Sequence, residues 1–208
     1  MNIRPALPPL GLALCLALGL YTGPAAAQAA SANGAAAAVH ELAGESVYHL
    51  QAGLVDQHGQ PLQWADLRGR PQLVSMFYAN CHLMCPLILE NAKTLQKQLP
   101  EAERGRLGVA MITLDPARDT PEAMAEVARN HRSPADWRYL VPANDDVRAL
   151  ASVLDVRYRF REDGSINHTS VLVLLDAEGR PLARSEVKGA APDPAFLAQV
   201  RAALAAAD

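Results

Sequence analysis

The sequence has few cysteines, no cluster of basic residues and no excess of glycine or proline. It holds three cysteines, 13 glycines and 15 prolines in 208 residues. The formal net charge is -3, and basic residues are interspersed with acidic ones, which argues against nucleic acid as a partner. Because 50% of the residues are hydrophobic and 20% are charged, we expect one ordinary globular domain with a sizeable core.

Several common catalytic patterns are missing as well. No Gly-rich phosphate loop, Ser-His-Asp order or paired-carboxylate arrangement stands out. The chemistry-bearing feature that is present is a pair of cysteines, Cys81 and Cys85. It lies between an apolar run that ends at Tyr78 and a helical stretch that opens at Pro86. This placement predicts a redox site, a metal site or both.

The proline after the second cysteine defines the local geometry that we expect. Proline is favoured in the first turn of a helix and disfavours helical geometry in the residue before it, so Cys85 should lie at the mouth of the helix and Cys81 in the preceding loop. Both sulfurs are then expected near the surface. A thiol beside the positive end of a helix dipole ionises more easily, and the thiolate is the form that binds metal or attacks disulfides.

The first residues, 1–27, have the pattern of a secretory signal. Arg4 precedes an apolar segment over 10–21, and Ala25 and Ala27 form the small-x-small pattern of a signal-peptidase site. The apolar segment is shorter than the ~20 residues of a membrane span, so we expect cleavage. An uncleaved anchor, with membrane association through residues 10–21, is the alternative.

Cleavage would also remove Cys15, so that Cys81 and Cys85 would be the cysteines of the exported chain. An exported chain with one close pair has a redox or metal pair and no disulfide framework. Residues 28–46 are rich in alanine and are expected to form a flexible linker. The folded domain is expected to span residues 47–208.

The domain alternates between apolar runs and stretches with helical spacing. We expect a hairpin over 51–64, strands over 72–78, 107–114, 137–141, 170–175 and 182–187, and helices over 87–99, 121–131, 145–154 and 194–206. This order predicts an α/β fold with a central mixed β-sheet flanked by helices and with an extra N-terminal hairpin. Sites in such folds gather at the carboxyl ends of strands, where Cys81 and Cys85 are expected.

Three motifs in chain order resemble the SCO/SenC family of copper proteins, whose fold is thioredoxin-like. They are Cys81-x-x-x-Cys85-Pro86, then Asp115-Pro116-x-Arg118-Asp119-Thr120-Pro121-Glu122, and then His168-x-Ser170 before an apolar strand with Asp176-x-x-Gly179. The resemblance covers roughly residues 47–206. Each motif is weak alone, whereas three in this order are specific.

The resemblance implies copper binding through two cysteines and one histidine, which here are Cys81, Cys85 and His168. It also implies assistance in assembling the binuclear copper centre of cytochrome c oxidase. Copper(I) prefers thiolates and copper(II) is well served by imidazole nitrogen, so this set of ligands suits both oxidation states. Position alone would make His168 a surface-loop histidine, and only the motif makes it a ligand.

The sequence departs from the family pattern in two places. Members commonly have proline and an acidic residue between the cysteines, whereas this chain has His82, Leu83 and Met84. His82 and Met84 are therefore additional potential copper ligands, with an exposed loop residue and an apolar contact as the alternatives. The third motif has Thr169 between the histidine and the serine, or in place of the usual serine.

The charged second motif, at residues 115–122, has two interpretations. It either contributes to a partner surface or to the copper loop, or it only organises the chain locally. We favour the local interpretation, in which Asp115 and Arg118 organise a turn while Asp119 and Thr120 cap the helix that follows.

The sequence therefore predicts an exported copper metallochaperone, either periplasmic or anchored to the inner membrane facing the periplasm. Its expected partners are the oxidase subunit that carries the binuclear copper centre, a thiol reductant or another copper carrier. The alternative is a thiol-disulfide oxidoreductase, in which a redox-active Cys81–Cys85 pair reduces cysteines of a respiratory oxidase or another exported partner. Only the copper carrier needs His168. A peroxide-reducing thiol enzyme is a third option, which rests on fold analogy alone.

Overall fold

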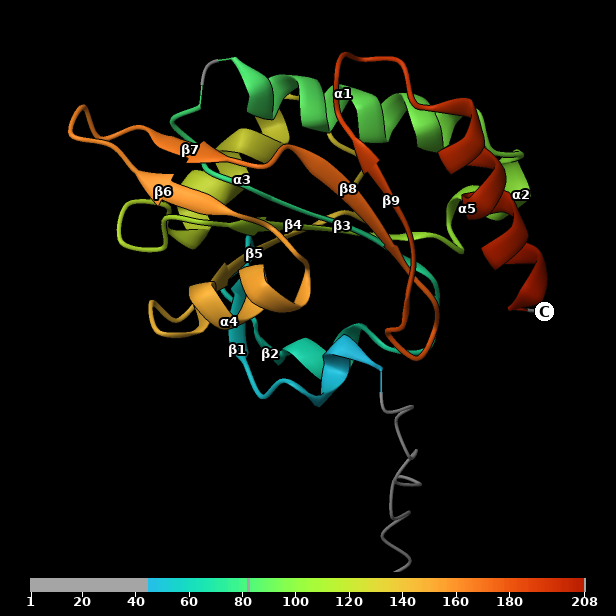
Figure 1. Ribbon diagram of the computed structural model, residues 1–208, viewed down its shortest axis with the longest axis horizontal. Coiled ribbons are helices and arrows are strands. Elements are labelled where there is room, and N and C mark those ends of the chain that lie inside the picture. The colour runs from blue at the N-terminus through green and yellow to red at the C-terminus, as the bar shows by residue number, and fades with distance from the viewer. Residues whose placement is uncertain (1–44, 82, 208) are drawn as a thin grey trace, which may run out of the picture. The chain divides into compact units, whose positions relative to one another are not determined.

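A computed structural model describes residues 45–81 and 83–207 (Figure 1). The expected signal segment and nearly all of the expected linker lie outside these residues. The strands in chain order are β1 (Gly53–Asp56), β2 (Pro61–Gln63), β3 (Gln72–Phe77), β4 (Gly108–Thr113), β5 (Arg138–Pro142), β6 (Tyr158–Phe160), β7 (Ile166–His168), β8 (Val171–Leu175) and β9 (Pro181–Glu186). The α-helices are α1 (Met84–Lys97), α2 (Glu101–Arg104), α3 (Pro121–Asn130), α4 (Asp146–Val153) and α5 (Pro194–Ala206).

The central sheet is mixed, as the sequence predicts. Its strand order is β2-β1-β5-β4-β3-β8-β9. Neighbouring β3, β4 and β5 are parallel, while β1 adds antiparallel to β5 and β8 adds antiparallel to β3. The predicted N-terminal hairpin is the β1–β2 pair, and it forms one edge of this sheet. Among the described helices, none has the length and apolarity needed to span a membrane.

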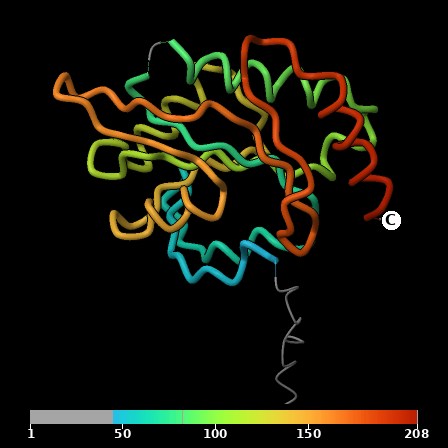
Figure 2. Tube along the Cα trace, in the orientation of Figure 1, coloured from blue at the N-terminus to red at the C-terminus, as the bar shows by residue number. Residues whose placement is uncertain are grey.

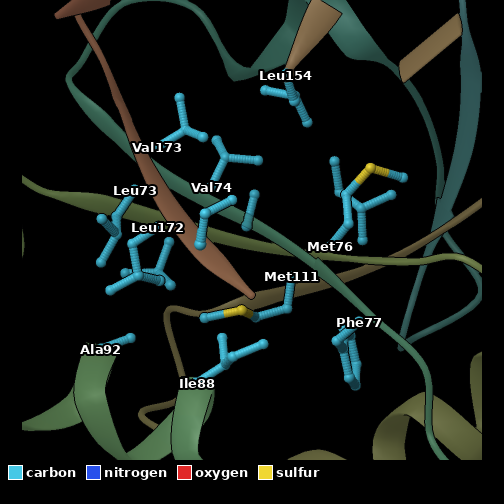
Figure 3. Close-up of a cluster of buried hydrophobic side chains, with 14 of the residues drawn as sticks. Leu73, Val74, Met76, Phe77, Ile88, Ala92, Met111, Leu154, Leu172 and Val173 are labelled. Atoms are coloured by element: carbon cyan, nitrogen blue, oxygen red, sulfur yellow. The ribbon is translucent and has the colours of Figure 1, made fainter. Parts of the chain in front are cut away.

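The middle strands are buried on both faces because helices cover both sides of the sheet. All six residues of β3 and all six of β4 are buried, as expected for parallel strands in an α/β fold. Figure 1 shows α1 along one side of the sheet and α4 on the other. Alternation along β3 divides the core between these helices: Leu73 and Phe77 lie on the side of Ile88 from α1, and Val74 lies on the side of Leu154 (Figure 3).

A second, smaller sheet was not predicted from the sequence. Strands β6 and β7 form an antiparallel hairpin in which Tyr158 pairs with His168 and Phe160 with Ile166. The turn uses Gly164, whose φ of 78° favours glycine. The hairpin reaches out from one end of the main sheet (Figure 2). His168 is therefore the last residue of a strand and does not lie in a surface loop.

Candidate metal centre

Cys81, Cys85 and His168 come together at one end of the central sheet. Cys81 follows β3, Cys85 lies in the first turn of α1, and His168 ends β7. One ligand atom from each residue can be chosen so that all three lie within 4.8 Å of one another. The proximity that the sequence implied only through a family resemblance is therefore present in the fold.

The two cysteines are linked through the start of α1. The helix begins at Met84, two residues earlier than the proline suggested, so Cys85 lies inside the first turn. Its backbone N–H donates a hydrogen bond to the Cys81 sulfur at 3.3 Å. The Cys81 sulfur therefore accepts from one of the N–H groups that a helix start leaves unpaired, at the positive end of the helix dipole.

The expectation that both sulfurs lie near the surface is wrong for Cys85. Cys81 is half-buried, whereas Cys85 is only 3% exposed and belongs to the hydrophobic core. Because the helix starts earlier than predicted, Cys85 falls on its inward face instead of at its mouth. Both thiols are free. One sulfur is thus open to reagents and partners, and the other is shielded.

His168 presents one ring nitrogen to the cysteines. Its Nδ1 lies 3.2 Å from the carbonyl oxygen of Thr169, and its Nε2 lies 3.7 Å from the Cys85 sulfur. Donation from Nδ1–H to the carbonyl leaves the lone pair on Nε2, which is the tautomer a metal ligand requires. Tyr78 packs edge-on against the imidazole, with ring centroids 5.9 Å apart. The Tyr78 ring therefore lines the site beside His168.

The protons are unequally divided between the two sulfurs. The pKa of Cys81 lies well below its ordinary value, first because the Cys85 thiol donates a hydrogen bond to it. The pKa of Cys85 is raised, because its proton is held in the bond to Cys81 and because the group is buried. Near neutral pH the metal-free site therefore holds a Cys81 thiolate and a Cys85 thiol.

Alkylation of the reduced, metal-free chain tests this division. Cys81 should keep its reactivity with iodoacetamide at about pH 6, where an ordinary cysteine with a pKa of about 8.5 is largely protonated. The sign follows from the lowered pKa, because the thiolate disappears only when the pH falls through that lowered value. Rates measured by peptide mass spectrometry separate Cys81 from Cys15. Cys85→Ala removes the main cause of the lowered Cys81 pKa, so the midpoint of the alkylation rate against pH should move to higher pH. A midpoint near pH 8.5 in the unaltered chain would contradict the division.

The residues between the cysteines are only partly described. His82, a potential auxiliary ligand, lies outside the described residues. Leu83 is 76% exposed, and Met84 is half-buried as the first residue of α1. Leu83 therefore adds an apolar side chain to the surface beside the half-buried Cys81.

The charged motif at residues 115–122 organises a turn and caps a helix, and it also contacts the segment that leads to Cys81. Asp115 pairs with Arg118 in a turn, and the Thr120 side chain caps α3 by accepting from the N–H of Ala123, as predicted. Asp119 differs from the prediction. Its carboxylate does not serve α3; it accepts hydrogen bonds from Thr113 and from the backbone of the segment leading to Cys81. Burial raises the pKa of this carboxyl group.

The donor set fits a soft metal ion. Sulfur and imidazole ligands hold such ions at about 2.0–2.3 Å, so their donor atoms lie about 3.5–4.5 Å apart around a shared ion. The 4.8 Å limit on the separations here requires only a small closing movement. A thiolate, a buried thiol and an imidazole can together bind a metal, and the two sulfurs can also exchange with a disulfide.

Comparisons with known proteins agree with this geometry. The SCO1/SenC family model matches residues 26–205. A protein of Stutzerimonas stutzeri whose name suggests copper binding is 30% identical over 133 residues, which are 62% of this chain and 64% of that protein. The chain thus spans a little under two thirds of that relative's length.

Solved structures share the fold. Bradyrhizobium japonicum ScoI with copper bound has a TM-score of 0.62 and 21% identity, over 74% of this chain and 97% of that one. BsSco, described with a disulfide switch and as a member of the Sco family of cytochrome c oxidase assembly proteins, has a TM-score of 0.65 and 20% identity, over 79% and 98% of the two chains. The fold is therefore thioredoxin-like, as predicted.

Proposed function

The chain belongs to the SCO1/SenC family, and from that premise we propose that it carries copper, held by Cys81, Cys85 and His168. The observation that supports this most directly is that the donor atoms of these three residues lie within 4.8 Å of one another. The third donor matters most. A simple dithiol exchanger has no need of an imidazole directed at its sulfurs, whereas a copper site gains a nitrogen ligand from it.

Each residue has a distinct part in loading the cargo. The Cys81 thiolate is half-buried and already ionised, so it is the first donor that an incoming copper(I) ion meets. The ion then displaces the proton of Cys85, whose buried sulfur completes the thiolate pair. His168 supplies Nε2, oriented by the bond from its Nδ1 to the carbonyl of Thr169. Transfer to an acceptor reverses this order, since Cys81 is the more accessible sulfur.

We also propose where the protein works and with what. The signal pattern at residues 1–27 supports a location outside the cytoplasm, in the periplasm or anchored to the inner membrane. Its family supports a role in maturing the copper centre of cytochrome c oxidase. The oxidase subunit that carries the binuclear copper centre is then the acceptor, and a second copper carrier or a thiol reductant is the supplier.

The second candidate function is thiol-disulfide exchange. The unequal division of protons favours it, because a half-buried thiolate beside a buried thiol has the arrangement of an attacking and a resolving cysteine. In this reaction Cys81 attacks the disulfide of a partner. Cys85 then loses its proton and closes the Cys81–Cys85 disulfide, releasing the partner as a dithiol.

Anaerobic reconstitution with copper(I) separates the two functions. We expect the reduced chain to bind about one copper ion and to release about one proton as it does so, because only Cys85 still carries a thiol proton. Metal analysis and a weakly buffered titration measure the two quantities. His168→Ala should weaken copper(II) binding more than copper(I) binding, since copper(II) depends more on nitrogen donors. Failure to bind copper, combined with rapid reduction of a model disulfide, would leave the exchange function in its place.

A further inference from the structure

The loop between β4 and α3 contacts both chain segments that carry the candidate ligands. Figure 1 shows this loop at the same end of the sheet as the β6–β7 hairpin. Its Asp119 contacts the segment between β3 and Cys81, and its Arg118 contacts the hairpin that ends at His168. Two consecutive residues therefore contact the two halves of one site.

Asp119 holds the cysteine side. The backbone N–H of Ala79, two residues before Cys81, donates to its carboxylate at 2.9 Å, and the Thr113 hydroxyl donates to the same oxygen. Asp119 is only 3% exposed. A buried carboxylate is costly unless donors surround it, and in this site one of those donors belongs to the cysteine segment. The position of Ala79 is thus tied to the end of β4.

Arg118 holds the histidine side. Its Nη2 donates to the carbonyl oxygen of Gly164 at 2.7 Å, while its Nε pairs with the Asp115 carboxylate. Gly164 forms the hairpin turn, and a Cβ there would lie 3.3 Å from Arg118 Nη1. An isolated two-stranded hairpin is marginally stable in water. An outside anchor on its turn therefore restricts where its last residue, His168, can lie.

We propose that Arg118 and Asp119 are positioning residues that brace the metal site, Asp119 placing Cys81 through Ala79 and Arg118 placing His168 through Gly164. The expected effect on copper binding rests on the proposed copper-carrier function, whereas the hydrogen bonds of the brace are present in the metal-free chain. Helix capping does not account for these two side chains, because Thr120 already caps α3. Their other contacts reach 40 and 46 residues away along the chain.

The brace is tested first in the metal-free, reduced full chain by amide hydrogen exchange. Asp119→Ala should speed exchange at Ala79 about tenfold, because the N–H loses its charged acceptor. Arg118→Met keeps the length of the side chain and should speed exchange at Gly164 and Arg161, the amides of the hairpin turn. Asp119→Asn, which keeps an acceptor oxygen, should largely restore protection at Ala79. It also provides a folded variant if Asp119→Ala does not fold.

The consequence for copper is then measured on the same proteins. Arg118→Met should lower copper(II) affinity about tenfold and weaken the nitrogen hyperfine signal of His168, while the thiolate charge-transfer band persists. Asp119→Ala should show the opposite pattern, with a shifted thiolate band and about tenfold weaker copper(I) binding. A general loss of fold stability would weaken the nitrogen hyperfine signal and the thiolate band together in both variants.

Arg106→Met is the matched control. Arg106 also donates through Nη2 to a backbone carbonyl at 2.7 Å, that of Leu204 in α5. This variant should leave the turn amides and both copper signals unchanged. Unaltered exchange at Ala79 and at the turn in the two brace variants would overturn the proposal even if copper binds. If the unaltered chain binds no copper but exchange changes as expected, the brace stands and the copper-carrier function fails.

Discussion

Cys81→Ser and Cys85→Ser are each expected to weaken copper(I) binding about a hundredfold or more. A serine hydroxyl is a hard, protonated donor, so each variant leaves one soft thiolate and one imidazole for a soft ion. Structural zinc sites with four ligands bind their ion with about 10–16 kcal/mol, or about 3 kcal/mol per ligand; loss of a similar contribution here corresponds to about a hundredfold weaker binding. Competition with a chromophoric copper(I) chelator measures the change.

The two variants should differ in stability although they agree in copper binding. Cys85 is buried in the core, so its replacement by serine places a hydroxyl among apolar groups and should lower the free energy of unfolding by about 1–2 kcal/mol. Cys81 is half-buried, and its replacement should cost less. Cys15→Ser serves as the thiol-removal control, because Cys15 is not among the proposed ligands. Near-normal copper affinity in both site variants would refute the assignment of the ligands.

Oxidation of the Cys81–Cys85 pair is expected to abolish copper binding. Forming the disulfide removes two electrons and consumes both sulfur ligands, and His168 alone cannot hold the ion. Oxidation with diamide should therefore reduce the stoichiometry from about one copper per chain to about zero, and dithiothreitol should restore it. The free thiols already lie in one cluster, so the two states can interconvert without unfolding.

The control for this prediction is Cys85→Ala, in which the Cys81–Cys85 disulfide cannot form. Its weak residual copper binding should not be lost on mild oxidation and regained on reduction, as it is in the unaltered chain. Copper bound with unchanged affinity by fully oxidised protein would exclude thiolate ligation. Such a result would also remove the link between the redox state of the surroundings and the cargo.

Local patterns predicted most of the framework of this fold. The apolar run at 72–78 appears as β3 over Gln72–Phe77, and helical spacing at 121–131 appears as α3 over Pro121–Asn130. These elements depend on side-chain periodicity and on capping residues such as Thr120. Both are local features, so they can be read from neighbouring residues in the sequence. The hairpin that carries His168 was missed, because its two strands have three residues each and carry no long alternation.

The sequence by itself identified the candidate ligands: two close cysteines at the end of a strand, and a histidine in the last of three ordered motifs. Only the tertiary structure decided how exposed each sulfur is. It buried Cys85 and left Cys81 half-buried, because the helix begins at Met84 and turns the second sulfur into the core. It also directed Asp119 to a backbone amide 40 residues away. Contacts of that kind depend on which strands become neighbours, and no periodicity along the chain encodes them.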